Sequence, residues 1–132
     1  MFKEYGGRLR LIFKDLPLPS HEFARAAHEA ARCAGALGRY WPYHDTLFAN
    51  QPKFERDDLI RYATDVGLSR EKFTACLDSH RFAPAVEADV AQARALGIRG
   101  TPTFVINGRL AVGALPVEDF RQLIDEALKE RR

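Results

Sequence analysis

The chain has 132 residues, of which 46% are hydrophobic and 29% are charged, and its formal net charge is +2. This amount of apolar side chain suffices for one core of ordinary size and excludes a disordered chain. Basic and acidic residues are interspersed rather than gathered into a stripe, so nucleic acid is not an expected partner, and no window approaches the roughly 18 consecutive apolar residues of a membrane span.

The first predicted element is a strand at residues 8–14. The segment alternates and then runs apolar, and Asp15 with Pro17 ends it, as expected for a buried strand that leads into a loop. Ahead of it, residues 2–5 followed by Gly6 and Gly7 resemble the last turn of a helix and its glycine cap.

A block of helices is predicted next. From Ser20, a candidate cap, apolar residues recur every three or four positions, and Gly38 is placed to end this amphipathic helix. Its apolar face is mostly alanine, so we expect close packing against a neighbouring helix. The same periodicity predicts helices at residues 41–49, 57–66, 69–80 and 82–96. In the last of them, the predicted buried face consists of Val86, Val90, Ala93 and Leu96.

A hairpin and a final helix complete the predicted elements. Residues 103–106 and 109–112 are β-prone and are joined by Asn107 and Gly108, the strongest two-residue hairpin signal. A helix follows Pro116, and its predicted buried side consists of Val117, Phe120, Leu123, Ile124, Ala127 and Leu128. The order strand, helical block, antiparallel hairpin and helix predicts an α/β chain with a large helical insertion.

The two cysteines, Cys33 and Cys76, are too few and too far apart for a zinc site. From the residues alone they are either two inert buried thiols or a disulfide. We expect no metal and no cofactor.

One nine-residue segment, GTPTFVING at residues 100–108, carries a specific resemblance. It resembles the Gly-Thr-Pro-Thr-Phe-x-Ile-Asn-Gly signature of the DsbA-like thioredoxin-fold thiol-disulfide oxidoreductases. Further agreement lies at residues 10–15, 30–34, 40–48 and 73–77. The resemblance covers essentially the whole chain and implies one domain, residues 1–132, with a thioredoxin-like, DsbA-type α/β fold and a helical insertion at about residues 20–97.

The same resemblance implies a missing catalytic segment. In that family a first strand leads into a Cys-x-x-Cys motif at the start of the first helix, where the helix dipole stabilises the thiolate. This sequence contains neither element, and Cys33 and Cys76 are not neighbours on one helical turn. We therefore expect a truncated chain without catalytic residues, inactive in disulfide exchange.

Other residue roles also come from the resemblance. It implies a cis peptide bond before Pro102 and assigns Thr101 and Pro102 to the binding of a thiol or peptide substrate; alternatively, Pro102 merely begins a strand. It favours a structural disulfide between Cys33 and Cys76, and with it a periplasmic or extracytoplasmic location, although no secretion signal follows Met1.

The absent first strand would lie between residues 8–14 and the hairpin, so two inner strand edges are expected to be unpaired. This absence has three possible outcomes. The two remaining strands pair directly with each other, another copy of the chain supplies the strand between them, or the true protein is longer. We expect a homo-oligomer formed through these edges, by domain swapping among other routes.

Two rival functions remain. One is a glutathione-binding protein similar to kappa-type transferases and hydroxychromene isomerases, which share the helical insertion. The other is a non-enzymatic module for peptide binding or oligomerisation. We assign His28, His44, His80 and the single tryptophan, Trp41, to packing rather than to catalysis.

Overall fold

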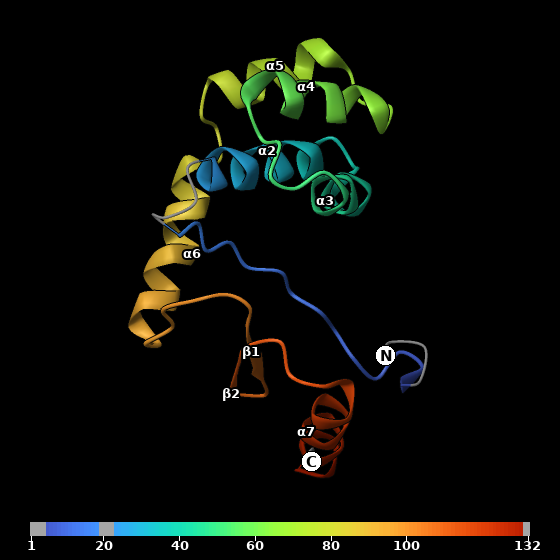
Figure 1. Ribbon diagram of the computed structural model, residues 1–132, viewed down its shortest axis with the longest axis vertical. Coiled ribbons are helices and arrows are strands. Elements are labelled where there is room, and N and C mark those ends of the chain that lie inside the picture. The colour runs from blue at the N-terminus through green and yellow to red at the C-terminus, as the bar shows by residue number, and fades with distance from the viewer. Residues whose placement is uncertain (1–4, 19–22, 131–132) are drawn as a thin grey trace. The chain divides into compact units, whose positions relative to one another are not determined.

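A computed structural model describes residues 5–18 and 23–130 of the chain (Figure 1). The chain divides into two compact units: the helical unit, Asp15–Gln92, and the hairpin unit, formed by the residues before and after it. The elements in chain order are α2 (Ala24–Ala36), α3 (Tyr40–Ala49), α4 (Arg56–Asp65), α5 (Arg70–Asp78), α6 (Ala83–Ala95), β1 (Thr103–Ile106), β2 (Arg109–Val112) and α7 (Val117–Glu130). None of the described helices combines the length and the hydropathy that a membrane span requires.

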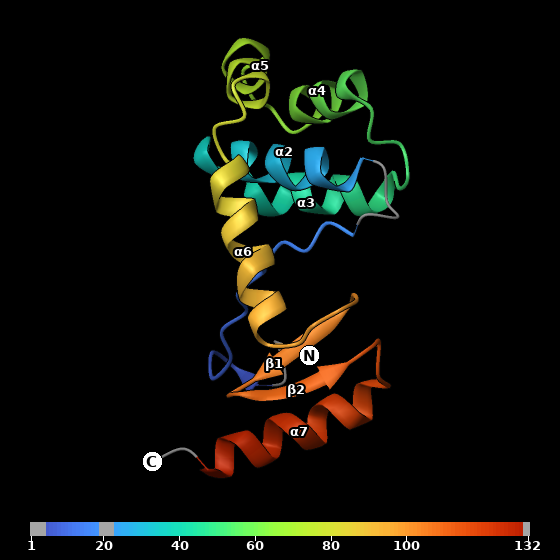
Figure 2. The same ribbon diagram turned by 90° about the vertical axis from the view of Figure 1, so that its left-hand side faces the viewer.

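The core of the helical unit is built around α2. This helix lies between α3 on one side and α4 and α5 on the other (Figures 1 and 2). Its predicted alanine face is buried, with Ala30 and Ala34 fully enclosed. Two larger side chains fill the space beyond: the rings of Tyr43 and Phe73 lie 5.4 Å apart, and the Tyr43 hydroxyl donates a hydrogen bond to the Leu59 carbonyl. Alanine thus serves here as a spacer that lets neighbouring helices approach.

A disulfide between Cys33 and Cys76 joins α2 to α5, with their Cα atoms 5.9 Å apart. The bond links residues 43 positions apart in the sequence. Closing a loop of that length in the unfolded chain is worth about 4 kcal/mol in the chain-entropy model. The covalent bond therefore adds substantially to the stability of the helical unit.

The ends of the helices agree with their sequence signals to within a few residues. The hydroxyl of Ser69 accepts a hydrogen bond from the Lys72 amide and caps α5. Just after the C-terminal end of α4, Gly67 takes a φ of +84°, which glycine adopts without strain. The predicted cap Ser20 lies outside the described residues, and α2 begins at Ala24.

The hairpin unit contains a two-stranded antiparallel sheet with α7 along one face (Figure 2). The predicted hairpin is confirmed: Ile106 pairs with Arg109 across Asn107 and Gly108, both of which have positive φ. On the face toward α7, the rings of Phe104 and Phe120 meet edge to face at 4.7 Å. The buried side chains of this unit are Tyr5, Ala111, Ile124 and Ala127.

The strand predicted at residues 8–14 was wrong, because these residues form no ladder with any described strand. Leu11 and Ile12 are 49% and 59% exposed. An apolar pattern makes a strand only where a partner supplies backbone hydrogen bonds. Residues 8–14 therefore do not provide one of the two unpaired strand edges that the sequence predicted.

Two predicted core positions were also wrong. Leu96 is 51% exposed because it follows the last residue of α6, and Val117 is 54% exposed. Val117 is the first residue of α7, one turn ahead of Phe120, whose ring packs against the hairpin.

Candidate functional site

The segment Gly100-Thr101-Pro102 leads directly into β1 and is held by two hydrogen bonds. The Thr103 hydroxyl donates to the Gly100 carbonyl at 2.7 Å, and the Gly113 amide donates to the Pro102 carbonyl at 2.8 Å. The Thr101–Pro102 peptide bond is cis, and both residues are exposed. The two residues to which the family resemblance gives a substrate-binding role thus lie on an accessible turn held by hydrogen bonds.

The outer edge of β1 continues from this turn. In a two-residue hairpin the pair next to the loop exchanges hydrogen bonds, and every second pair along the ladder does the same. Phe104 and Ile106 therefore direct their backbone groups toward β2, whereas Thr103 and Val105 direct theirs away from it. Within residues 5–18 and 23–130 no other strand pairs with that edge.

The face of the hairpin opposite α7 is apolar and exposed. The register places Val105 beside Leu110, and Val112 beside Thr103, on this face. Val105, Leu110 and Val112 are 50%, 51% and 72% exposed. Together with the outer edge of β1, this face offers both backbone hydrogen bonds and apolar contact to an extended partner.

The two cysteines belong to the helical unit, whereas this site belongs to the hairpin unit. Cys33 is 1% exposed, and it is bonded to Cys76. Because these are the only two cysteines among the 132 residues, the chain holds no free thiol to attack a disulfide.

The three histidines assigned to packing, His28, His44 and His80, and the tryptophan belong to the helical unit. Trp41, His44 and Phe48 stack along one side of α3, with ring centroids 5.0 and 4.6 Å apart. His80 pairs with the buried carboxylate of Glu29 at 3.1 Å, and His28 contacts Asp15. Within the helical unit these residues thus take part in aromatic stacking and in hydrogen bonds to carboxylates.

Sequence reasoning missed a buried polar cluster around Arg32. Its guanidinium contacts Asp15 at 2.5 Å and Asp89 at 2.7 Å, and His28 contacts Asp15 at 2.8 Å. Burial by itself raises the pKa of Asp15, but the hydrogen bonds and charges of His28 and Arg32 outweigh it, so that pKa lies below its ordinary value. Burial, reinforced by the charge of Asp15, raises the pKa of Tyr40 to about 12.

A faint signal for this cluster was present in the sequence. Arg32 stands inside the alanine face of α2, and Asp89 lies between Val86 and Val90 on the buried side of α6. A charged residue in an apolar helical face needs a partner. Periodicity alone does not name that partner.

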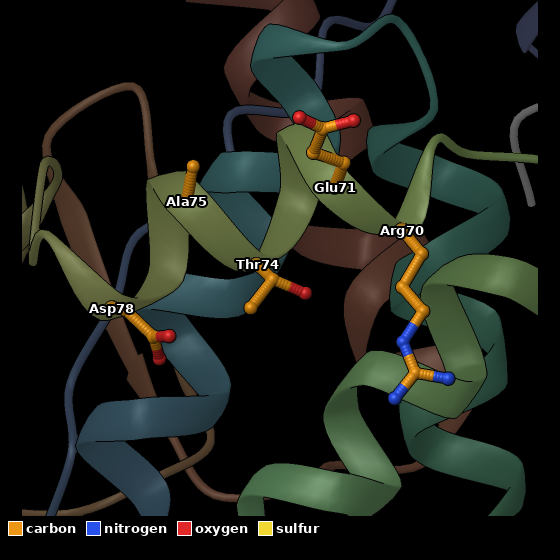
Figure 3. Close-up of a pocket in the computed structure, with 5 residues that line it drawn as sticks. All are labelled: Arg70, Glu71, Thr74, Ala75 and Asp78. Carbon is orange, nitrogen blue, oxygen red and sulfur yellow. The ribbon is translucent and has the colours of Figure 1, made fainter.

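A hollow of about 580 Å³ lies on α5, lined by Arg70, Glu71, Thr74, Ala75 and Asp78 (Figure 3). It is open to solvent, and its side chains point to different sides of one helix instead of converging. Asp78 is already engaged by Arg56 at 2.8 Å. This hollow does not have the enclosure of a ligand site.

Comparison with known proteins adds a family and a set of relatives. Residues 1–126 match the family model described as Thioredoxin. An Na(+)/H(+) antiporter NhaA of Herminiimonas arsenicoxydans is 34% identical over 128 residues, which are 97% of this chain and 20% of that protein. NhaA 3 of Salinispora tropica is 34% identical over 125 residues, 94% of this chain and 19% of its own length. NhaA of Nitrosospira multiformis is 37% identical over 106 residues, which are 80% of this chain and 17% of that protein.

The chain thus spans about a fifth of the length of the curated relatives it matches. The family match, by contrast, covers nearly the whole chain, from the first residue through most of α7. The chain belongs to the thioredoxin family.

Proposed function

We propose that this chain is the peptide-binding part of a DsbA-like thiol-disulfide oxidoreductase domain and that by itself it does not exchange disulfides. The turn at Thr101 and Pro102 and the outer edge of β1 form the binding side. An extended peptide with a cysteine pairs with this edge as an added strand.

The geometry of the edge carries this proposal. Thr103 and Val105 direct amide and carbonyl groups outward, and the turn before them is exposed and fixed by hydrogen bonds to Gly100 and Gly113. Main-chain pairing supplies affinity for any extended sequence, while the exposed Val105 adds apolar contact. Such recognition suits an enzyme class that acts on many unfolded substrates.

The proposed inactivity follows from the chemistry of the cysteines. Disulfide exchange needs a free thiolate. Both cysteines of the sequence are bonded to each other, and Cys33 is buried. A reactive dithiol therefore has to be supplied from outside these 132 residues.

The relatives support a setting for this domain. Their names are those of Na(+)/H(+) antiporters, and the matched part is about a fifth of each protein. We propose that this domain accompanies such an antiporter in a longer protein and works in an oxidising, extracytoplasmic compartment. The disulfide supports the second statement, because such bonds persist in oxidising compartments.

A peptide-binding experiment tests the edge. The probe is reduced and alkylated insulin B chain carrying a fluorophore, and the measurement is fluorescence anisotropy. Val105→Pro removes an outward amide of β1 without touching the β1–β2 ladder, so we expect binding to fall by at least tenfold, as for the loss of one or two main-chain hydrogen bonds.

Leu110→Pro is the matched control, because it removes an outward amide from the opposite edge of the same hairpin. Leu110 also lies on the exposed apolar face, but this variant keeps the outward amides of β1, so we expect a loss of binding several times smaller than that of Val105→Pro. Equal loss in both variants, or no binding by the unaltered chain, contradicts the proposed site. In an insulin-reduction assay the unaltered chain is expected to be inactive, and catalytic turnover contradicts the proposed role of the cysteines.

Self-association is a second candidate function, favoured by the same unpaired edge. Two copies that pair β1 with β1 satisfy the outward backbone groups of Thr103 and Val105. We expect a dimer by light scattering at high protein concentration and a monomer for Val105→Pro. A strictly monomeric mass at all concentrations rules this function out.

A further inference from the structure

The outward side of α3 carries aromatic rings next to an exposed carboxylate. Its inward side is fixed by Tyr43 and Leu47, which are buried in the core of the helical unit. Because an α-helix turns once every 3.6 residues, Trp41, Asp45 and Phe48 lie on the opposite side. Trp41 and Phe48 are 44% and 55% exposed, and the side chain of Asp45 is 79% exposed. This side of α3 is therefore open to a partner.

Asp45 has an aromatic neighbour on each side. Trp41 precedes it by four residues and Phe48 follows it by three, and residues at these spacings are neighbours on a helix surface. The ring centroid of His44 lies 5.0 Å from that of Trp41 and 4.6 Å from that of Phe48. His44 Nδ1 also lies 3.2 Å from Asp45 Oδ1. The carboxylate is thus held next to a continuous row of rings.

This combination is suited to a cation. The face of an aromatic ring attracts a guanidinium or an ammonium, and a carboxylate attracts the same groups. The planar guanidinium of arginine satisfies both partners at once, because it stacks on a ring and presents its donors in a fork to a carboxylate. The ammonium of lysine is a compact, strongly hydrated charge, so we expect arginine to be preferred.

The shape of the surface indicates where that cation comes from. One side of a single helix is convex, whereas sites for small molecules are concave and bury most of the ligand. A partner protein brings a surface of its own, which excludes water around the central contact. An arginine side chain of a partner protein therefore suits this surface better than a free small cation does.

We propose that the outward side of α3 is a docking surface for an arginine-bearing segment of a partner protein. The surface consists of Trp41, His44, Asp45 and Phe48. Asp45 pairs with the guanidinium, and the neighbouring rings stack against it. The inference does not rest on the proposed function, because all four residues belong to the helical unit and the proposed peptide edge belongs to the hairpin unit.

Trp41 reports binding directly, because it is the only tryptophan of the chain and belongs to the surface. The probe is a peptide of three Gly-Arg repeats with blocked ends, and the matched probe has citrulline, the uncharged analogue, in place of arginine. At low ionic strength we expect a saturable change of Trp41 fluorescence with the arginine peptide and about tenfold weaker binding of the citrulline peptide. Equal affinities of the two peptides, or an unchanged fluorescence, overturn the proposal.

Asp45→Asn tests the carboxylate, with a fluorophore on the arginine peptide and anisotropy as the measurement. We expect binding to become about threefold to fivefold weaker. Glu71→Gln is the matched control, because it removes the same charge from an exposed position of α5, across α2 from α3 (Figure 1). This control is expected to bind as the unaltered chain does. An equal loss in the two variants would show that only the net charge matters, which contradicts the docking surface.

Trp41→Leu and Phe48→Leu test the rings, since leucine keeps apolar volume but has no aromatic face. We expect each variant to bind the labelled arginine peptide about twofold to fivefold more weakly. Far-UV circular dichroism shows whether each variant is folded, and Phe48→Leu alone decides the question should Trp41→Leu fail to fold. Unchanged affinity in the folded variants rules out the contribution of the rings and, with it, the proposed surface.

Discussion

The helical unit and the hairpin unit are held together in different ways. In the helical unit, side chains from four helices enclose one another, and a disulfide and a buried ion cluster join distant segments. In the hairpin unit, one helix covers one face of a two-stranded sheet, and three apolar side chains on the other face stay exposed.

This difference assigns most of the stabilising bonds to one part of the chain and the proposed binding side to another. Two strands and a helix bury little surface, so the hairpin unit depends more on local sequence signals for its stability than the helical unit does. The proposed binding side lies in the hairpin unit, while the tertiary bonds lie in the helical unit. The experiments below test that division, from the largest expected effect to the smallest.

Removal of the disulfide is expected to have the largest effect. The pair Cys33→Ala with Cys76→Ala should lower the free energy of unfolding of the helical unit by about 4 kcal/mol, because the unfolded chain gains freedom. Denaturant unfolding followed by Trp41, the only tryptophan and a residue of α3, measures this unit. Hydrogen exchange of the hairpin amides should stay unchanged. If these amides lost their protection together with the helical unit, the two units would not be separable in stability.

Asp15→Asn tests the buried ion cluster. Loss of charged hydrogen bonds should destabilise the helical unit by about 1.5–3 kcal/mol at neutral pH. Since the folded pKa of Asp15 lies below its ordinary value of 3.8, its contribution is complete above that value and is lost as the pH falls through the lower, folded pKa.

Between pH 5 and acid pH the unaltered chain should lose the contribution of Asp15, which the variant lacks at every pH. The loss of unfolding free energy on acidification should therefore be smaller in the variant, by about 1.5–3 kcal/mol. Denaturant midpoints of Trp41 fluorescence at a series of pH values provide the measurement. Parallel pH profiles would mean that other carboxylates dominate.

Gly108→Ala addresses the hairpin unit. Gly108 has a φ of +88°, and a side chain in this region costs about 1–2 kcal/mol. We expect faster exchange of the β1 and β2 amides with no change in the Trp41 unfolding midpoint. Gly100→Ala is the control, because a Cβ there meets no atom within 4 Å and its φ is not in that region.

Ser69→Ala is expected to have the smallest effect. The Ser69 hydroxyl caps α5, and loss of such a cap costs about 1 kcal/mol. The Trp41 midpoint should shift, while the hairpin amides should not respond. Ser69→Asp should restore the stability, since aspartate caps as well as serine does.

Elements with local causes could be predicted well. Asn107 and Gly108 specify their hairpin through their own backbone preferences, and Ser69 marks the start of α5. The strand at residues 8–14 could not be predicted correctly, because a strand depends on a partner, and none of the described strands lies beside it. The candidate residues Thr101 and Pro102 came from the signature, but the outward direction of the β1 edge came from the register.

The sequence by itself determined the helices, the hairpin and the family signature, because periodicity, caps and turn residues act over a few positions. Only the tertiary structure decided which distant groups meet. Arg32 joins Asp15 and Asp89, and Glu29 pairs with His80, across separations of 17 to 57 residues. No local preference encodes such pairs, since they form only after packing has brought buried charges within reach of each other.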